Sequence, residues 1–275
     1  MPGAVSSTLI NGQAADSLPL SDRALAYGDG LFETMRVVAG GVPLWSRHLR
    51  RLRRGCQALR LDLPAVELGA EIEAMALRLG DGVIKLVLSR GSGPRGYAIP
   101  SETQPTRILY ALPAPTYPLA HAEEGVQLFP CQTRLAQQPL LAGIKHLNRL
   151  EQVLARSEWQ CDQYAEGLVC DQLGQPVECT MSNLFLRLAE GWVTPELTQC
   201  GVQGVMRDLL IEAAAQAGDP VQVRPVGFPE LLTAHEVMCC NTLFGVWPVV
   251  QLEDRRWAVG PHTRRMQSLA KQAYL

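Results

Sequence analysis

A proline-rich segment near the middle of the chain most constrains the fold. The segment PAPTYPLAHAEE carries three prolines between Pro113 and Pro118, and prolines at this density disfavour both helix and sheet. Strands and helices are predicted on both sides of it, so two units are expected rather than one. We predict an N-terminal α+β subdomain over residues 1–112, a linker over 113–124 and a C-terminal α+β subdomain over 125–275.

The order of the predicted elements assigns the chain to the α+β class. Antiparallel hairpins and helices are mixed without the regular strand–helix–strand alternation of a parallel sheet. The apolar run VIKLVLSR, residues 83–90, predicts a strand buried on both faces. Residues 46–60 are predicted as a helix whose buried stripe includes His48 and Leu52, with Arg51 at the edge of that stripe.

Composition excludes several classes of protein. Hydrophobic residues make up 47% of the chain and charged residues 19%, which is typical of a folded domain rather than a disordered one. A net charge of −2 gives no reason to expect nucleic acid or an anionic membrane as a partner. No uncharged stretch is long enough for a membrane span, and the eight cysteines lack zinc-site spacing, so no metal is expected. A reduced, cytoplasmic setting with free thiols is expected.

Lysine is scarce, which draws attention to each one present. Of the 25 basic residues, only Lys85, Lys145 and Lys271 are lysines. Lys145 follows the apolar run LLAGI in a predicted loop just before a helix. A desolvated lysine has a lowered pKa and becomes a nucleophilic amine, as a Schiff base with a carbonyl such as that of pyridoxal 5'-phosphate (PLP) requires. The alternative is a lysine that pairs with a neighbouring carboxylate.

Five motifs in order resemble the fold-type IV PLP enzymes, which include branched-chain aminotransferases, D-amino-acid transaminases and aminodeoxychorismate lyases. The resemblance covers nearly the whole chain and implies a two-subdomain fold with the cofactor site between the subdomains. The motifs are SDRALAYGDGLFETMRV (21–37), HLRRL (48–52), GIKHLNRLEQVLARSE (143–158), VECTMSNLF (177–185) and QGVMRDLL (203–210).

The resemblance assigns cofactor roles to specific residues. Lys145, in the C-terminal subdomain, is implied to carry PLP, and Glu178 to keep the pyridine nitrogen protonated so that the ring is a better electron sink. Arg51 is implied to bind the phosphate, and Arg149 stands where the aminotransferases have a tyrosine, which leaves its role open. The cofactor-binding set is Lys145, Glu178, Arg51, Arg149, the helix-opening amides of Val205 and Met206, and Asn241 and Thr242.

Within the family, the substrate side is most similar to aminodeoxychorismate lyase. Thr34 in FETMR stands where branched-chain enzymes have a glycine, and the segment SRGSGPRGY, residues 89–97, also resembles the lyase. The implied substrate, 4-amino-4-deoxychorismate, is a dianion, and Arg36 and Arg95 could bind its carboxylates, with Tyr97 nearby in sequence. Either arginine could instead form a structural salt bridge.

The implied reaction releases 4-aminobenzoate and pyruvate in folate biosynthesis, with Lys145 as the base and Thr34 assisting the leaving enolpyruvyl group. A D-amino-acid or branched-chain aminotransferase of the same fold remains the main alternative. A cofactor-free binding protein that inherited the fold is a second one, disfavoured by the complete set of Lys145, Glu178 and Arg51. The resemblance also implies a homodimer.

Overall fold

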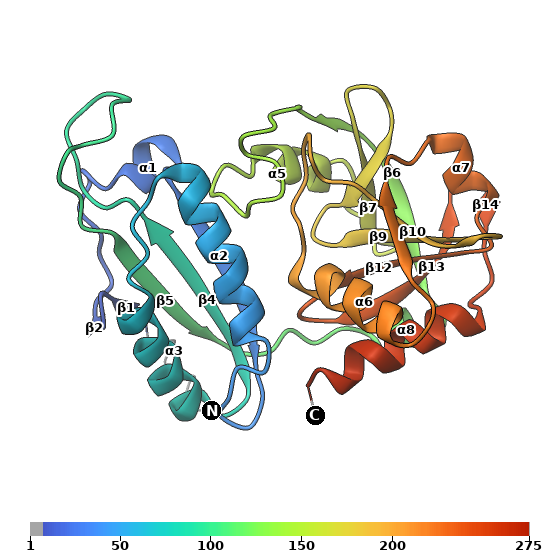
Figure 1. The fold of residues 1–275 in the computed structure, drawn as a ribbon, viewed down its shortest axis with the longest axis horizontal. Helices are drawn as coiled ribbons and strands as arrows, with labels where there is room; N and C mark the ends of the chain where they lie inside the picture. The colour runs from blue at the N-terminus through green and yellow to red at the C-terminus, as the bar shows by residue number, and fades with distance from the viewer. Residues whose placement is uncertain (1–7, 275) are drawn as a thin grey trace. The chain divides into compact units, whose positions relative to one another are not determined.

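The computed structural model describes residues 8–274, which form two compact units (Figure 1). The first unit contains the described chain through Pro115 together with the separate segment Ile144–Asn148. The second contains Thr116–Gly143 and Arg149–Leu275. Each unit combines a largely antiparallel sheet with helices, which confirms the predicted α+β class.

The first unit is an antiparallel five-stranded sheet with the order β2-β1-β5-β4-β3. Helices α2 and α3 pack against this sheet, α2 on β3 and α3 on β4 and β5 (Figure 1). Strand β3 is therefore the edge strand beneath α2. The elements are β1 (Thr8–Ile10), β2 (Gln13–Ala14), α1 (Arg23–Tyr27), β3 (Gly30–Val37), α2 (Trp45–Leu59), α3 (Ala65–Leu79), β4 (Gly82–Ser89) and β5 (Thr106–Leu112).

Helix α2 forms where its apolar periodicity predicts it. It buries His48, Leu52 and Cys56 on one stripe, and the structure buries Arg51 beside them. The helix begins at Trp45 with Leu44 in the N-cap position, two residues before Ser46, the N-cap that the sequence predicts, and no side chain caps it. The sequence therefore located both this helix and its buried face.

The segment Ile144–Asn148 corrects the predicted domain assignment of Lys145. The Phe32 N–H donates to the Lys145 carbonyl (3.0 Å), and the Leu147 N–H donates to the Gly30 carbonyl (3.0 Å), so the segment extends the sheet at its β3 edge. Its backbone pairing places Lys145 in the first unit and not in the C-terminal one. The first unit ends at Pro115, and a short helix, α4 (Leu119–Glu123), lies within the segment predicted as a linker.

The second unit is built on a nine-stranded sheet with the order β11-β10-β9-β12-β13-β6-β7-β8, with β14 paired to β13. Because β8 also pairs with β9, strands β9, β12, β13, β6, β7 and β8 close into a ring. The strands are β6 (Val126–Leu135), β7 (Tyr164–Asp171), β8 (Pro176–Cys179), β9 (Asn183–Leu188), β10 (Gly191–Pro195), β11 (Val221–Arg224), β12 (Glu236–Asn241), β13 (Gly245–Leu252) and β14 (Arg255–Arg256).

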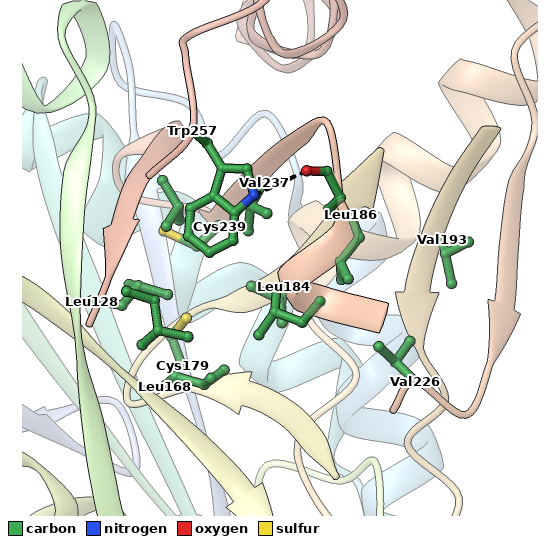
Figure 2. Packing of buried hydrophobic residues seen from close by; sticks show 14 of the residues in the cluster. Leu128, Leu168, Cys179, Leu184, Leu186, Val193, Val226, Val237, Cys239 and Trp257 are labelled. Atoms are coloured by element: carbon green, nitrogen blue, oxygen red, sulfur yellow. Dashed lines mark hydrogen bonds between the residues drawn. The ribbon is translucent and has the colours of Figure 1, made fainter. Parts of the chain in front are cut away.

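The main hydrophobic core of the second unit is formed largely by the strands of this ring. Side chains of Leu128, Leu184, Val237 and their neighbours gather there, and Trp257 Nε1 donates to the Ala234 carbonyl at 3.1 Å (Figure 2). The helices of the unit are α4, α5 (Leu150–Ser157), α6 (Val205–Gln216), α7 (Phe228–Thr233) and α8 (Pro261–Gln272). Over residues 8–274, none of the helices has the length and apolar character needed to cross a membrane.

Candidate active site

Strand β3 sorts its side chains onto two faces. Leu31, Glu33 and Met35 are buried, whereas Phe32 and Thr34 between them are partly accessible. This alternation follows from the two-residue period of a strand. Thr34 and Arg36 therefore lie on the same face as Phe32, and Glu33 points to the opposite, buried face.

Lys145 lies over the Phe32 face of β3. Its Nζ is 4.4 Å from the centroid of the Phe32 ring, within cation–π range, and its backbone carbonyl accepts from the Phe32 N–H. The lysine singled out by the sequence thus lies on the strand face that carries Thr34. The loop position predicted for Lys145, just before helix α5, is confirmed.

A second lysine shares that face, and the sequence reasoning missed it. In the β3–β4 register Lys85 stands directly opposite Thr34, and in the β4–β5 register it stands opposite Tyr110. Opposed residues of an antiparallel pair project to the same side, about 5 Å apart at Cβ. Lys85 is the exposed charged residue of an otherwise apolar strand, and that contrast was the signal that could have identified it.

On the buried face, Glu33 holds Arg51 in an ion pair. Arg51 Nε donates to Glu33 Oε1 at 2.8 Å and Arg51 Nη2 donates to Glu33 Oε2, while His48 Nδ1 lies 2.7 Å from the same Oε2. Burial alone would raise the pKa of the Glu33 carboxyl, but the charge and hydrogen bonds of Arg51 outweigh it and lower the pKa to about 2. Glu33 is therefore ionised, and no pattern in the sequence marked it as a partner of Arg51.

Burial is also the main influence on His48. It lowers the pKa of the imidazole, against the nearby Glu33 carboxylate, which raises it. The positive charges of Arg51 and Lys145 lower it further. His48 is thus neutral near pH 7, and its Nδ1–H donates to Glu33.

Arg95 and Tyr97, predicted to bind substrate, are exposed in the loop between β4 and β5. The residue between them anchors the loop: Arg23 Nη1 donates to the Gly96 carbonyl and the Gly96 N–H donates to the Tyr27 hydroxyl, both at 2.9 Å. Gly96 adopts φ +116°, which favours glycine. The Arg23 N–H also donates to the Gly91 carbonyl at 3.0 Å, and the Tyr97 ring packs edge-on against Tyr27, so the loop is tied to α1 at several points while Arg95 and Tyr97 stay accessible.

In the second unit, the carboxylate of Glu178 is held by neutral donors. Its Oε2 accepts from the Val202 N–H at 2.8 Å and from Asn183 Nδ2 at 3.4 Å, and Asn183 Nδ2 also donates to the Val202 carbonyl at 2.9 Å. A Cβ added at Gly204 would stand 2.0 Å from Asn183 Oδ1, so only glycine fits there. These contacts fix the direction of the Glu178 side chain.

The opening of α6 lies directly after Gly204. Gly204 is the N-cap and no side chain caps the helix, so the first-turn amides, including those of Val205 and Met206, have no partner within the helix. Arg207 is buried in the same turn and donates to the Thr194 hydroxyl (3.3 Å) and the Pro195 carbonyl (3.0 Å). Arg207 is also paired with Asp208 of the same turn at 3.4 Å, so it is the helix dipole and the first-turn amides that favour an anion at this end.

Arg149 occupies the N-cap position of α5, next to the lysine segment. Burial lowers the pKa of its guanidinium, while the carboxylates of Glu178 and Glu151 act in the opposite direction. The second unit therefore brings Arg149 into the field of Glu178, as a cofactor site that uses both would require.

Asn241 and Thr242 lie at the turn between β12 and β13. Asn241 Oδ1 accepts from the backbone N–H groups of Leu243 and Phe244, and its Nδ2 donates to the Met181 carbonyl at 3.2 Å. The Thr242 carbonyl accepts from the Tyr274 hydroxyl at 2.7 Å. The Asn241 side chain thus stabilises the turn, and a phosphate contact from this pair stays a prediction.

Comparison with known proteins assigns the chain to a family. A family model described as "Amino-transferase class IV" matches residues 30–252. The chain belongs to this family. The class IV match spans β3, the Lys145 segment, Glu178 and the start of α6, so it includes most of the residues described above.

Among relatives of the class IV chain, the aminodeoxychorismate lyase of Vibrio harveyi is 38% identical over 94% of this chain and 97% of its own. A putative branched-chain-amino-acid aminotransferase of Methanocaldococcus jannaschii is 29% identical over 95% and 94%. The crystal structure of 4-amino-4-deoxychorismate lyase from Pseudomonas aeruginosa superimposes with a TM-score of 0.95 at 50% identity, covering 96% and 98%. The predicted fold and family are thereby confirmed.

Proposed function

We propose that this chain is a PLP-dependent aminodeoxychorismate lyase, which converts 4-amino-4-deoxychorismate to 4-aminobenzoate and pyruvate. The observation that carries the proposal is the placement of Lys145 over Phe32, on the strand face that bears Thr34. The two lyases named above, at 38% and 50% identity over nearly the whole chain, support the same reaction. Folate biosynthesis, which uses 4-aminobenzoate, is the expected role.

The residues present fit PLP in their chemistry. The chain offers an amine at Lys145, a cation at Arg51, a helix start at Val205 and a buried carboxylate at Glu178. The amine matches the carbonyl of the cofactor, the cation and the helix start match its phosphate, and the carboxylate matches its ring nitrogen. When bound, PLP supplies the electron sink for the carbanion formed at the substrate.

Each residue then has a defined task around the cofactor. Lys145 would hold the cofactor through its amine, and the free amine would take the proton from C4 of the substrate. Glu178, fixed by Val202 and Asn183, keeps the proton on the ring nitrogen. We assign the phosphate to Arg51 and the α6 amides, with Asn241 and Thr242 beside it, and the phenolate oxygen to Arg149.

The substrate side lies on the Phe32 face of β3. Loss of the C4 proton is followed by cleavage of the C3–O bond, so the ring becomes aromatic and pyruvate leaves as its enol. Thr34 donates a hydrogen bond to this leaving group. Arg36 on that face and Arg95 in the loop between β4 and β5 bind the two carboxylates, with Tyr97 in the same loop, and Lys85 opposite Thr34 adds a further cation to the β3 face.

An aminotransferase remains the second candidate, because the M. jannaschii relative carries that name and shares 29% identity. Product analysis separates the two. The lyase releases 4-aminobenzoate and pyruvate in equal amounts without a keto acid. Amino transfer from D-alanine or leucine to 2-oxoglutarate, with no 4-aminobenzoate formed, would replace the lyase by the transaminase.

The site of cofactor attachment has its own test. Borohydride reduction followed by peptide mass spectrometry should place the pyridoxyl group on the peptide that contains Lys145. The expected control is the absence of label on the peptides of Lys85 and Lys271. Labelling of either of those instead would move the site.

The protein is proposed to act as a homodimer. Leu150, Val153 and Leu154 of α5 are 76%, 60% and 58% exposed and share one helix face. Such a cluster of exposed apolar side chains marks an interface, and a second copy of the chain is the proposed occupant. Val153→Glu should shift the mass measured by light scattering from dimer to monomer.

A cytoplasmic location is proposed from the cysteines. All eight are free thiols in the part of the chain that the structure describes, and most are buried in the cores. Free thiols persist in a reducing compartment. Expression in the source cell with a tagged chain, followed by fractionation, tests this.

A further inference from the structure

The ion pair between Glu33 and Arg51 lies on the buried side of β3. Glu33 is 1% exposed and Arg51 7%, so both charges are almost fully removed from water. Removing two charges from water costs about as much as their attraction returns, so such a pair is weak evidence for stability. What a buried, bidentate pair does provide is a fixed geometry.

We infer that Glu33 is a positioning residue that sets the orientation of Arg51 toward the phosphate of PLP. This inference rests on the proposed function, in which Arg51 binds that phosphate. Two parallel hydrogen bonds, from Nε to Oε1 and from Nη2 to Oε2, hold the guanidinium in one plane. The edge that carries Nη1 is thereby directed away from Glu33.

The position of Glu33 in the strand explains why orientation matters. Glu33 lies between Phe32, which contacts the Lys145 ammonium, and Thr34, so its backbone is the same strand that carries the reacting face. Through its side chain, that strand also fixes Arg51 on α2. The amine and the phosphate-binding cation are therefore held at a set separation through one residue.

His48 acts on Glu33 from the preceding turn of α2. Its Nδ1–H donates to Glu33 Oε2 at 2.7 Å, and the residue lies three positions before Arg51 on the same helix. The Glu33 carboxylate is thus held by two residues of α2, and rotation about its Cγ–Cδ bond would break at least one of these hydrogen bonds. His48 is assigned as a second positioning residue, acting through Glu33.

The test measures how well the protein distinguishes PLP from pyridoxal, which lacks the phosphate. Dissociation constants for both are obtained by absorbance titration of the cofactor-depleted, full-length protein, and their ratio is the readout. A general loss of folding would weaken both ligands together, whereas a displaced Arg51 weakens only PLP. Glu33→Asp keeps the charge but withdraws both oxygens by one methylene, and Glu33→Gln keeps the size but removes the charge.

The chain offers a matched control in the pair of Glu71 and Arg107. Arg107 Nε and Nη2 both donate to the Glu71 carboxylate, at 3.0 and 2.6 Å, so the geometry is similar but lies between α3 and β5. Glu71→Asp and Glu71→Gln should leave the ratio unchanged. Glu33→Asp and Glu33→Gln should each reduce the preference for PLP about tenfold, as expected for the loss of one well-aligned charge-assisted bond.

Two results would overturn the inference. One is an unchanged preference in Glu33→Asp. The other is a stronger preference for PLP in Glu33→Gln, since removing the negative charge would then have helped the phosphate and Glu33 would only offset the charge of Arg51.

Three further variants, two at His48 and one at Arg51, complete the test. If the Glu33 variants do not fold, the two His48 variants replace them. His48→Leu should show a smaller loss of preference for PLP, and His48→Asn, which retains a donor near the Nδ1 position, should restore the preference. The same ratio of dissociation constants in both His48 variants would contradict the inference. Arg51→Ala separates this inference from the proposed function. No loss of preference in Arg51→Ala removes Arg51 from the phosphate site, whereas a loss there with none in Glu33→Asp overturns the role of Glu33 alone.

Discussion

Glu33 in the first unit and Glu166 in the second are equally buried, yet their pKa values move in opposite directions. Burial raises the pKa of Glu166 despite donors at Ser182 Oγ (2.6 Å), the Thr180 hydroxyl and two backbone N–H groups. The same burial is overcome at Glu33, where a guanidinium is added to the donors. The neutral hydrogen bonds therefore do not offset the effect of burial on the pKa of Glu166, whereas the added guanidinium offsets it at Glu33.

Glu178 stands between these two cases. Like Glu166 it accepts from neutral donors, Val202 N–H and Asn183 Nδ2, but the charge of Arg149 also acts on it within the second unit. Glu33 and Glu178 thus each have a cation in their surroundings, whereas the donors to Glu166 are all neutral groups. Four measurements test this difference.

Truncation of Glu33 should have the largest effect. Glu33→Ala leaves the Arg51 cation buried without its carboxylate, and breaking such a pair costs about 3–5 kcal/mol of unfolding free energy. Urea denaturation of the cofactor-depleted protein measures this. Glu71→Ala, in the more accessible pair with Arg107, should cost about 1 kcal/mol or less. Equal losses in the two variants would remove the distinction between the pairs.

Acid should selectively destabilise the wild type through Glu33. Its pKa is lowered from 4.5 to about 2 on folding, so its contribution is present above pH 4.5 and is lost as pH falls toward 2. The difference in unfolding free energy between wild type and Glu33→Gln should shrink by about 3 kcal/mol over that range. A difference that stays constant with pH would mean that Glu33 is not an ionised partner of Arg51.

Glu178→Gln should slow turnover about 100-fold while the cofactor remains bound, because the ring nitrogen loses the carboxylate that keeps it protonated. Steady-state release of 4-aminobenzoate and the visible spectrum of the loaded protein measure the two properties. Asn183→Leu, which removes one of the donors to Glu178, should move turnover in the same direction by a smaller factor. Unchanged turnover in Glu178→Gln would exclude this residue from the ring nitrogen.

Substitution of Glu166 should have the smallest effect on stability, and its pH dependence should be opposite to that of Glu33. Its raised pKa means that its contribution to stability is present at low pH and is lost as pH rises through the folded value. Glu166→Gln is uncharged at every pH, so the unfolding free energy of this variant should rise relative to that of the wild type as pH increases. Urea denaturation of both proteins over a series of pH values tests this. A wild type whose unfolding free energy rises relative to that of the variant as pH increases would contradict the raised pKa of Glu166.

Local patterns predicted most of the elements, and long-range pairing explains the exceptions. The stripe of His48, Leu52 and Cys56 located α2, because a helix buries residues at fixed spacings. Residues 144–148 were assigned to the second subdomain because they follow its first strand. Their backbone bonds to β3 place them in the first unit, and no property of GIKHLNR itself encodes a partner more than 100 residues away.

The site was predictable where a residue type was scarce or part of a motif. Lys145 and Glu178 were singled out as candidates in this way. In the structure the Lys145 ammonium lies over the Phe32 ring, and the Glu178 carboxylate accepts from the Val202 N–H. Glu33 was passed over, since one glutamate in a strand has no spacing that marks it as a partner of Arg51. Lys85 was passed over because its relation to Thr34 exists only in the register of two strands.

The segment Ile144–Asn148 has a consequence for synthesis. The polypeptide that forms the first unit is complete through β5 by Pro115, but the edge of β3 lacks its last backbone partners until residues 144–148 have been made. During translation, the Phe32 N–H and the Gly30 carbonyl therefore lack these backbone partners until the segment that follows β6 has left the ribosome. The step that completes the edge of the first sheet is the same step that brings Lys145 to Phe32, so completion of that sheet and placement of the Lys145 amine are one event.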